Sequence, residues 1–297
     1  MRIIAEHLTH EYNPKSPFAT KALNDVSLTV EEGDFFGIIG HTGSGKSTFV
    51  QHINGLIRLP SSLKRRKKRD NVRFTVGEFD LTSKKTDFFT LRKKVGMVFQ
   101  YPENQLFAET VFEDVAFAYR NYAQKKPTKE EVESAVKEAL TIVGLDYEKF
   151  KDASPFDLSG GQKRRVAIAG VVVAKPEILV LDEPAAGLDP LGKKEVMALL
   201  HKLHQSWCKT VVIVSHDMDE IAENSTRVAV FSEGRVLRVL PPRELFKETE
   251  LLLEHGLDLP LTAKLVLALK KEGVEIDCDY TTSDFVKQVL AKKESVS

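Results

Sequence analysis

One stretch of nine residues constrains this chain of 297 residues more than any other, because it fits the phosphate-binding pattern G-x-x-x-x-G-K-[S/T]. The stretch comprises Gly40, His41, Thr42, Gly43, Ser44, Gly45, Lys46, Ser47 and Thr48. The apolar run 34–39 predicts a buried strand before it, and residues 49–56 have the apolar spacing of a helix that ends near Gly55. The order of strand, glycine-rich turn and helix favours a phosphate loop over a simple turn with a surface lysine.

The chemistry of a nucleoside triphosphate explains the residue types in this phosphate loop (residues 40–48). Glycines lack Cβ, so backbone N–H groups can turn inward and approach the phosphate oxygens. The N-terminus of the following helix adds the positive end of its dipole. We expect Lys46 to reach the β- and γ-phosphates and the Ser47 hydroxyl to ligate Mg²⁺.

Composition narrows the setting in which the phosphate loop works. The chain has 43 basic and 43 acidic residues, which gives no sign of wholesale nucleic-acid binding, and its length allows one large domain or two. Its two cysteines, Cys208 and Cys278, show no metal-ligand spacing and suit a reducing compartment. An acid at Glu6 argues against a signal peptide, and the longest apolar run, 166–174, is too short to span a membrane. We therefore expect a cytoplasmic protein that reaches a membrane only through a partner.

Carboxylates and a histidine follow two strands of a predicted parallel sheet. The apolar strand 178–181 leads into Asp182 and Glu183, and the strand 210–215 leads into His216. The carboxyl ends of such strands form the edge where α/β folds bind ligands. Asp182 therefore fits a Mg²⁺ ligand, bound directly or through water, and Glu183 fits a general base or an orienter for an attacking water. A lone histidine is usually structural, but the expected place of His216 at the same edge favours a functional role. A solvated turn is the alternative for the two carboxylates, and the buried strand before them argues against it.

Two further residues each allow two interpretations. Gln100 ends a strand in a small β region expected over 72–100, where it is either a simple strand-end residue or a ligand of Mg²⁺ or water that senses the γ-phosphate. Tyr12 is expected in a loop between strands at 3–8 and 23–39. It is either an aromatic plate for a nucleotide base or a half-buried loop tyrosine, and on this residue alone the second interpretation is favoured.

A second anion cradle is predicted at the start of the helix 162–174. The residues of this signature segment are Leu158, Ser159, Gly160, Gly161 and Gln162. The Ser159 hydroxyl and the glycine N–H groups are well placed to bind an anion at a helix N-terminus, whereas the alternative is that they only begin the helix.

Other segments predict packing or contacts. Residues 110–150 are expected to be helical, with a capping box at Thr128–Glu131, and amphipathic helices are expected over 243–255, 261–271 and 283–292. The apolar faces of these C-terminal helices pack either on their own domain or on another subunit.

The run Lys64–Arg69 contains six consecutive cations. A solvated loop is the simplest interpretation, attraction to anionic lipid headgroups is the second, and nucleic-acid binding is the third.

The order of these motifs resembles that of ATP-binding-cassette (ABC) ATPases over residues 1–240. More narrowly, the chain resembles the ATPase subunit of an energy-coupling factor (ECF) transporter, on the evidence of residues 40–43, 54–56 and 98–107 and the short tail after 241. The phosphate loop, with Thr42, resembles that of the second of the two ECF ATPase paralogues. The resemblance implies an α/β fold of the P-loop NTPase, ABC type. Such a fold has a mixed core sheet with helices, an antiparallel β subdomain, an inserted helical subdomain over about 101–165, and an α-rich extension over 241–297 that contacts a second ATPase.

The resemblance also implies a role for each motif residue. Tyr12 would stack on adenine, the phosphate loop would bind ATP, and the implied Mg²⁺ ligands are Ser47, Gln100 and Asp182. The implied catalytic residues are Glu183, His216 and Gln100. The signature segment would serve the nucleotide of the other subunit, with Asp189 at that interface. Tyr101 and Glu103, within a coupling segment formed by residues 101–107, would help to receive a membrane subunit.

This resemblance predicts an ATPase that works as half of a dimer, an identical chain or a paralogue, at the cytoplasmic face of the membrane. Its partners would be a transmembrane coupling subunit and a substrate-binding membrane subunit, and its cargo a vitamin or a transition-metal ion. A soluble ABC ATPase acting on nucleic acid or the ribosome is the alternative, but it predicts a long coiled coil or two cassettes in one chain, and neither is present. A regulatory module without hydrolysis is disfavoured by Glu183 and His216.

Overall fold

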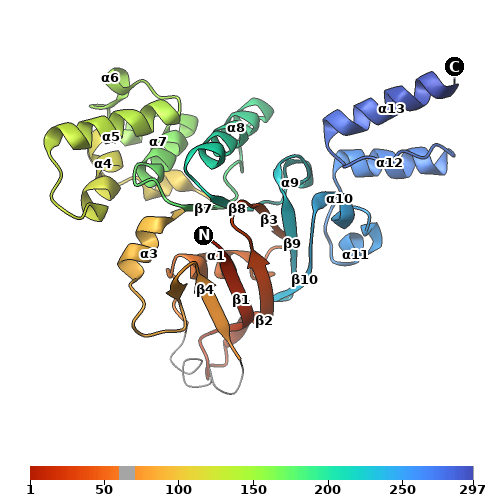
Figure 1. Ribbon diagram of the computed structural model, residues 1–297, viewed down its shortest axis with the longest axis horizontal. Helices are drawn as coiled ribbons and strands as arrows, with labels where there is room; N and C mark the ends of the chain where they lie inside the picture. The colour runs from red at the N-terminus through yellow and green to blue at the C-terminus, as the bar shows by residue number, and fades with distance from the viewer. Residues whose placement is uncertain (60–70, 297) are drawn as a thin grey trace. The chain divides into compact units, whose positions relative to one another are not determined.

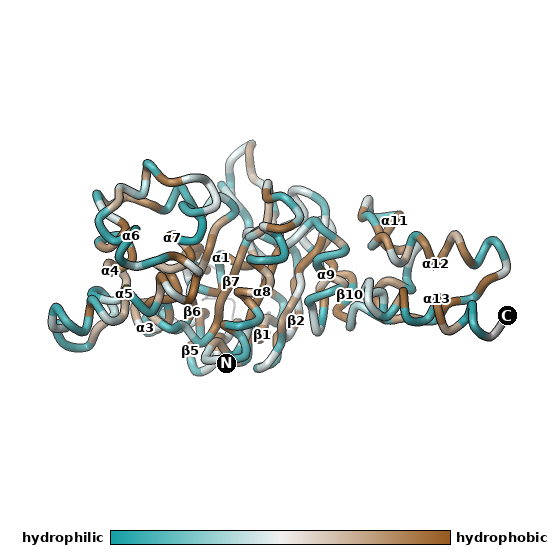
Figure 2. Tube along the Cα trace, turned by 90° about the horizontal axis from the view of Figure 1, so that it is seen from above, coloured by the Kyte–Doolittle hydropathy of each residue, from teal (hydrophilic) through white to brown (hydrophobic). Residues whose placement is uncertain are grey.

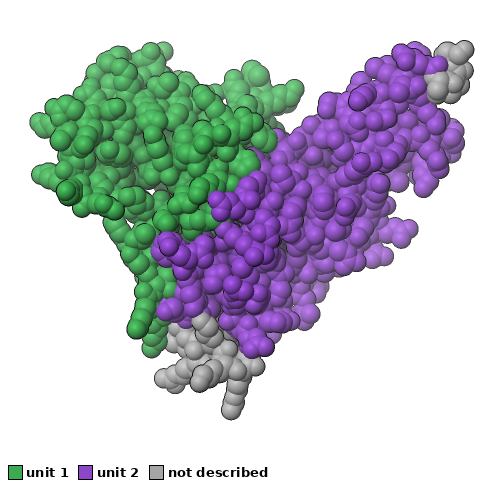
Figure 3. Space-filling view, in the orientation of Figure 1, with its two compact units in different colours: residues 1, 50–58, 84–212 green, residues 2–49, 59–83, 213–297 purple. Residues whose placement is uncertain are grey.

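The computed structural model describes residues 1–59 and 71–296, so the basic run 64–69 lies outside the described residues (Figure 1). The chain divides into two compact units, coloured separately in Figure 3. Unit 1 comprises residues 1, 50–58 and 84–212, and unit 2 comprises residues 2–49, 59–83 and 213–297. Two of the points where the chain passes between the units lie within helix α1 (Lys46–Ile53) and within strand β8 (Thr210–Val214).

Unit 2 contains an antiparallel sheet in the order β2-β1-β4-β5. Its strands are β1 (Ile3–Tyr12), β2 (Thr20–Val30), β4 (Arg73–Val76) and β5 (Phe79–Asp80). Tyr12 is the last residue of β1 and pairs with Thr20, so its expected place in a loop is wrong. The alternation of apolar residues breaks at His7, which adopts a left-handed φ of 55° beside a register shift, yet pairing with β2 resumes beyond this bulge.

Unit 2 also holds the strand that leads into the phosphate loop. This strand, β3 (Phe35–Gly40), is buried throughout and pairs in parallel with β9 (Arg227–Ser232), while β10 (Arg235–Leu240) pairs with β9 in antiparallel fashion. Parallel and antiparallel pairing in one set of strands matches the mixed core sheet expected from the sequence. Two sides of β3 are covered by protein, which explains why its sequence is apolar without alternation.

Helices complete unit 2. They are α9 (Met218–Asn224), α10 (Pro242–Leu245), α11 (Thr249–Glu254), α12 (Leu261–Lys271) and α13 (Thr282–Val296). The single helix expected over 243–255 is therefore two short helices, and Leu245, Phe246 and Leu252 are all completely buried in this arrangement. The backbone N–H groups of Leu261 in α12 and Thr282 in α13 donate to the side-chain carboxylates of Asp219 and Glu223 in α9, at 2.7 and 2.6 Å.

Unit 1 is mostly helical. Its helices are α3 (Phe88–Lys94), α4 (Val111–Tyr122), α5 (Lys129–Ile142), α6 (Tyr147–Phe150), α7 (Gly160–Val172) and α8 (Pro190–Ser206), with short 3₁₀ helices η1 (Pro102–Gln105) and η2 (Pro155–Asp157). Helices α4, α5 and α7 pack together (Figure 1), and each carries a fully buried valine: Val115, Val136 and Val166. The capping box predicted at Thr128 and Glu131 is present.

Two parallel strands of unit 1, β6 (Val95–Val98) and β7 (Ile178–Asp182), are buried along their whole length. Figure 2 shows the hydrophobic character of β7. The prediction of one β region over 72–100 is wrong, because β4 belongs to the antiparallel sheet of unit 2 and β6 pairs with β7. Helix α3 separates the two, and Asp87 caps its start by accepting hydrogen bonds from the N–H groups of Phe89 and Thr90.

Candidate nucleotide-binding site

Three glycines of the phosphate loop have left-handed φ angles, and at two of them a side chain would also clash with a neighbouring strand. Gly40 has a φ of 153°, and a β-carbon there would lie 2.3 Å from the carbonyl oxygen of Phe231. Gly45 has a φ of 102°, and a β-carbon there would lie 2.4 Å from the carbonyl oxygen of Ala22. The chain therefore needs glycine here both for its backbone angles and for close packing against two neighbouring strands.

Lys46, the first residue of α1, folds back over the loop. Its side chain is buried, and Nζ donates hydrogen bonds to the carbonyl oxygens of Gly40 at 2.6 Å and His41 at 2.9 Å. A buried ammonium is stable only when its N–H groups are paired. The loop carbonyls thus hold the positive charge at the helix N-terminus, where phosphate oxygens can replace them as partners.

The turn between β9 and β10 is hydrogen-bonded to the phosphate loop, a contact that was not predicted from the sequence. The N–H of Gly234, between β9 and β10, donates to the Ser44 carbonyl at 3.0 Å, and its own carbonyl accepts from the N–H of Asn24 at 2.8 Å. Both residues of this turn, Glu233 and Gly234, have left-handed φ angles, 48° and 73°. No sequence signal indicates its contact with the loop, because the contact is made by backbone atoms.

Tyr12 lies at the end of β1, and its hydroxyl is 3.2 Å from Oγ1 of Thr48 in the first turn of α1. The rings of Tyr12 and His10 also form a T-shaped pair, with centroids 4.6 Å apart and planes at 75°. The ring remains 39% exposed. Its orientation is thus fixed by two contacts while part of its surface stays open, which is the property that a stacking residue needs.

His216 follows β8 in unit 2 and is exposed. The preceding residue, Ser215, donates its N–H to the carbonyl of Ile38 in β3 at 3.3 Å, and its Oγ accepts from the N–H of Asp217 at 3.1 Å. The residue before His216 is therefore hydrogen-bonded to the strand that enters the phosphate loop.

Within unit 1 the structure brings together two side chains that were predicted separately. Asp182 ends β7 and is 7% exposed, and Glu183 after it has a left-handed φ of 52°. The Nε2 of Gln100, which follows β6, donates to Oε2 of Glu183 at 2.8 Å. The sequence placed both residues at strand ends but gave no sign of this hydrogen bond.

The signature segment begins α7 as predicted, although the helix starts at Gly160 and not at residue 162. Ser159 is the N-cap, and it exchanges hydrogen bonds with Gln162 in a capping box. Gly160 and Gly161 are exposed, and a β-carbon at either would meet no atom within 4 Å. Their open surroundings within the chain leave this helix N-terminus accessible to a ligand from outside.

The coupling segment exposes aromatic rings. Tyr101 is 56% exposed and Phe107 is 60% exposed, and the rings of Phe107 and Phe117 form a T-shaped pair with centroids 4.9 Å apart. The buried carboxylate of Asp114 accepts hydrogen bonds from the N–H groups of Phe107 and Ala108 at 2.9 and 3.0 Å. Among the described residues, Oε2 of Glu103 is buried without a hydrogen-bond partner.

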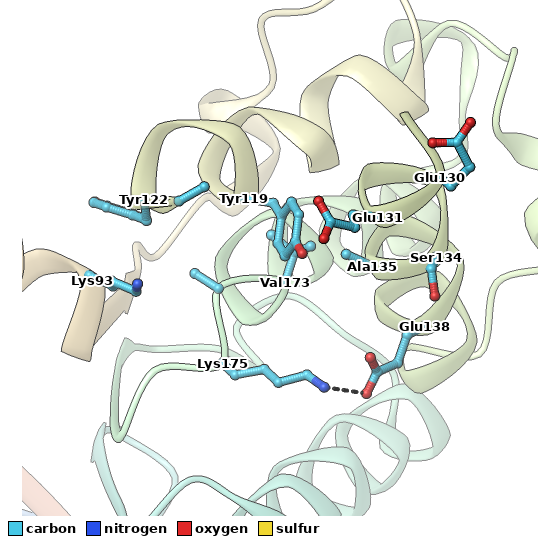
Figure 4. A pocket seen from close by; sticks show the side chains of 12 residues that line it. Lys93, Tyr119, Tyr122, Glu130, Glu131, Ser134, Ala135, Glu138, Val173 and Lys175 are labelled. Atoms are coloured by element: carbon cyan, nitrogen blue, oxygen red, sulfur yellow. Dashed lines mark ion pairs between the residues drawn. The ribbon is translucent and has the colours of Figure 1, made fainter. Parts of the chain in front are cut away.

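A cavity of about 650 Å³ lies elsewhere in unit 1, among α3, α4, α5 and the end of α7 (Figure 4). Lys175 and Glu138 form an ion pair of 2.7 Å on its wall. None of the predicted site residues lines it. The predicted residues instead form two groups. The phosphate loop, Tyr12 and His216 lie in unit 2, and the residues of the other group, Gln100, Asp182, Glu183, Asp189 and the signature segment, lie in unit 1.

Comparison with known proteins defines the class. The family model described as ABC transporter matches residues 23–186. The dimeric structure of the ATP-binding cassette MJ0796 in a post-hydrolysis state, bound to ADP and Pi, aligns with a TM-score of 0.69 and 29% identity, covering 80% of this chain and 98% of that one. The fold is that of a P-loop NTPase of the ABC type.

Relatives that match nearly the full length of the chain define the family within the ABC class. The energy-coupling factor transporter ATP-binding protein EcfA2 of Clostridium tetani is 45% identical over 292 residues, which cover 98% of this chain and 97% of that protein. The structure of cbiO1 from Clostridium perfringens, described as part of the ABC transporter complex cbiONQ, has a TM-score of 0.70 and 37% identity, covering 89% of this chain and 97% of that one. This chain belongs to the family of ECF transporter ATP-binding proteins.

Proposed function

We propose that this chain binds and hydrolyses ATP with Mg²⁺, as one of two cassettes that drive the uptake of a vitamin or a transition-metal ion through membrane subunits. One observation carries the proposal: the Lys46 ammonium is held by loop carbonyls in a glycine-shaped loop at a helix N-terminus. The relationship to ECF transporter ATP-binding proteins supports the same function.

Nucleotide binding follows from the residues of unit 2. Phosphate oxygens of ATP carry more negative charge than carbonyls, so Lys46 exchanges its bonds to Gly40 and His41 for bonds to the β- and γ-phosphates. The loop N–H groups donate hydrogen bonds to the remaining phosphate oxygens. The partly exposed ring of Tyr12, anchored at Thr48, stacks on adenine.

The residues assigned to Mg²⁺ fit it by their chemistry. The Ser47 hydroxyl, the Gln100 amide oxygen and the Asp182 carboxylate are all oxygen donors, which Mg²⁺ prefers. The bound ion would neutralise phosphate charge. Because the Gln100 amide nitrogen bonds to Glu183, its oxygen remains available as a ligand.

Hydrolysis is assigned to Glu183, Gln100 and His216. The Glu183 carboxylate accepts the proton of the attacking water, and the hydrogen bond from Gln100 holds that carboxylate in place. The exposed imidazole of His216 contacts the γ-phosphate. The water oxygen bonds to the γ-phosphorus as the bond from that phosphorus to the ADP oxygen breaks, and the contact with His216 ends when inorganic phosphate leaves.

A second cassette, an identical chain or a paralogue, completes the site. The accessible helix N-terminus at Ser159 binds the γ-phosphate held by the partner's loop, and Asp189 lies at the interface. ATP then favours the closed pair, because it binds that state better than the open one. We assign residues 1–240 to the ATP-binding domain, 101–165 to its helical subdomain and 241–297 to an extension that contacts the second ATPase.

The coupling segment receives the transmembrane coupling subunit. The exposed rings of Tyr101 and Phe107 supply contact area, and the buried Oε2 of Glu103 pairs with a basic residue of that subunit. The complex also contains a substrate-binding membrane subunit. Within the described residues, no helix has the length and apolar character needed to cross a membrane. We place the chain at the cytoplasmic face of the membrane, attached through these partners.

Reconstitution tests this function. The chain is co-expressed with the membrane subunits of its own source, purified as a complex and inserted into vesicles. We expect ATP-dependent accumulation of one labelled vitamin or transition-metal ion, and the copurified small molecule identifies it. Failure of the chain to hydrolyse ATP, or hydrolysis without association with any membrane subunit, would contradict the proposal.

A further inference from the structure

A buried arginine outside the predicted site connects two parts of it. Arg164 lies on α7, and its side chain is 6% exposed. Its Nη1 donates hydrogen bonds to the carbonyl oxygens of Pro184 at 3.0 Å and Ala186 at 2.9 Å. These carbonyls belong to the catalytic turn, which we define as residues 183–189.

The catalytic turn has features that need such support. Glu183 adopts a left-handed φ of 52°, which is rare for a residue with a side chain and persists where the surroundings hold it. Within the turn, the Ala186 N–H donates to the Glu183 carbonyl at 3.1 Å, and the Leu188 N–H donates to the Ala185 carbonyl at 3.2 Å. Because one nitrogen of Arg164 bonds two carbonyls that are two residues apart, it fixes the curvature of the turn.

The position of Arg164 on its helix gives the contact a further consequence. Ser159, the N-cap of α7, precedes Arg164 by five residues, or about 7.5 Å of helix. The catalytic turn ends at Asp189, which caps α8 by accepting a hydrogen bond from the Gly192 N–H at 2.9 Å. A single rigid helix therefore carries both the signature segment and the group that holds the catalytic turn.

We propose that Arg164 is a positioning residue for ATP hydrolysis. It holds the catalytic turn against α7, so that the Glu183 carboxylate and Asp189 keep a fixed orientation relative to Ser159. This role rests on the proposed function, in which Ser159 and Glu183 act on different nucleotides of a cassette pair. Arg164 then ties the two sites of the pair together within one chain.

The neighbouring residues of α7 do not share these contacts. Arg165 donates to the Val143 carbonyl at 2.8 Å and pairs with Glu195 at 2.6 Å, and both partners lie outside the turn. Lys163 is partly exposed. Lys163→Met is therefore a matched control for Arg164→Met, because it removes one positive charge from the same helix.

Amide hydrogen exchange and steady-state kinetics on the intact complex test the proposal. In Arg164→Met we expect the amides of Ala186 and Leu188 to exchange at least about tenfold faster, because the turn opens more often. We expect kcat to fall about ten- to hundredfold, because the general base is misplaced, while KM for ATP changes less than about twofold. Arg164→Lys should lie between, since one ammonium can still reach one carbonyl. Lys163→Met should match the wild type in both measurements.

Unchanged amide exchange and kcat in Arg164→Met would overturn the proposal, and so would equal losses in Lys163→Met. If Arg164→Met does not fold, Arg164→Lys decides, and wild-type exchange and turnover there would overturn it. The proposed function fails separately, if the wild-type complex does not hydrolyse ATP. The exchange comparison still tests whether Arg164 holds the turn in that case.

Discussion

The phosphate loop and the catalytic turn solve a similar problem in different ways. Both hold a left-handed backbone, at Gly45 and at Glu183, next to a group that meets phosphate or water. The loop does so with residues that have no side chain and with a backbone bond from Gly234 in the β9–β10 turn, whereas the catalytic turn is bonded by the side chain of Arg164 on α7. The local sequence therefore predicts most of the loop's conformation. In the catalytic turn it predicts the Glu183 carboxylate but not the contact with Arg164 that supports the turn.

The largest expected effect is a loss of ATP turnover without a loss of ATP binding, on substitution of Glu183 in the catalytic turn. In Glu183→Gln, turnover should fall by about 10²- to 10⁴-fold, because an amide cannot take the proton of the attacking water. ATP affinity should remain close to the wild-type value, since the phosphate loop is intact and Gln100 can still donate to the new amide oxygen. Single-turnover hydrolysis and equilibrium ATP binding measure the two properties. Hydrolysis at the wild-type rate would remove Glu183 from this role.

The opposite pattern is expected in the loop. Lys46→Ala should weaken ATP binding by about 10- to 100-fold, because it removes charge-assisted hydrogen bonds to phosphate. Titration with a fluorescent ATP analogue measures the affinity. Lys287→Ala, on exposed α13, removes the same charge far along the chain and should bind ATP normally. Unchanged affinity in Lys46→Ala would count against the whole phosphate site.

How far the sequence predicts this molecule depends on whether a structural feature is local. The strand, loop and helix around Lys46, the capping box at Thr128 and the strand ends at Asp182 are predictable from short patterns. The bulge at His7 breaks a pattern without breaking the strand, so β1 was predicted too short.

The supports of the site are less predictable, because they join residues that are distant in the sequence. The bond from Gly234 to Ser44 uses backbone atoms, which every residue type has. Arg164 is one of three consecutive basic residues, and nothing in the sequence distinguishes the one that turns inward. Gln100 and Glu183 were each predicted from a strand end, but their contact depends on the pairing of β6 with β7.

An intermediate effect on ATP affinity is expected at Gly234, whose N–H is bonded to the Ser44 carbonyl of the phosphate loop. Gly234→Ala places a side chain at a left-handed φ of 73°, with its β-carbon 2.9 Å from the Ala22 carbonyl oxygen, so the turn must move. We expect ATP affinity to fall about tenfold, because the Ser44 carbonyl loses its support. Isothermal titration measures it. Gly273→Ala is the matched control, with a φ of 81° and no atom within 4 Å. Equal ATP affinities in the two variants would show that this bond has no role in binding.

The smallest expected effect concerns the base and not the phosphates. Tyr12→Ala should reduce the preference for ATP over GTP about two- to tenfold, because it removes the stacking surface and leaves the loop in place. Tyr12→Phe is the sharper variant, since it keeps the ring but loses the hydrogen bond to Thr48. If stacking alone sets the preference, Tyr12→Phe should retain it, whereas a loss equal to that of Tyr12→Ala would mean that the anchor at Thr48 orients the ring. Competition binding with both nucleotides distinguishes these outcomes, and an unchanged ratio in Tyr12→Ala would contradict stacking.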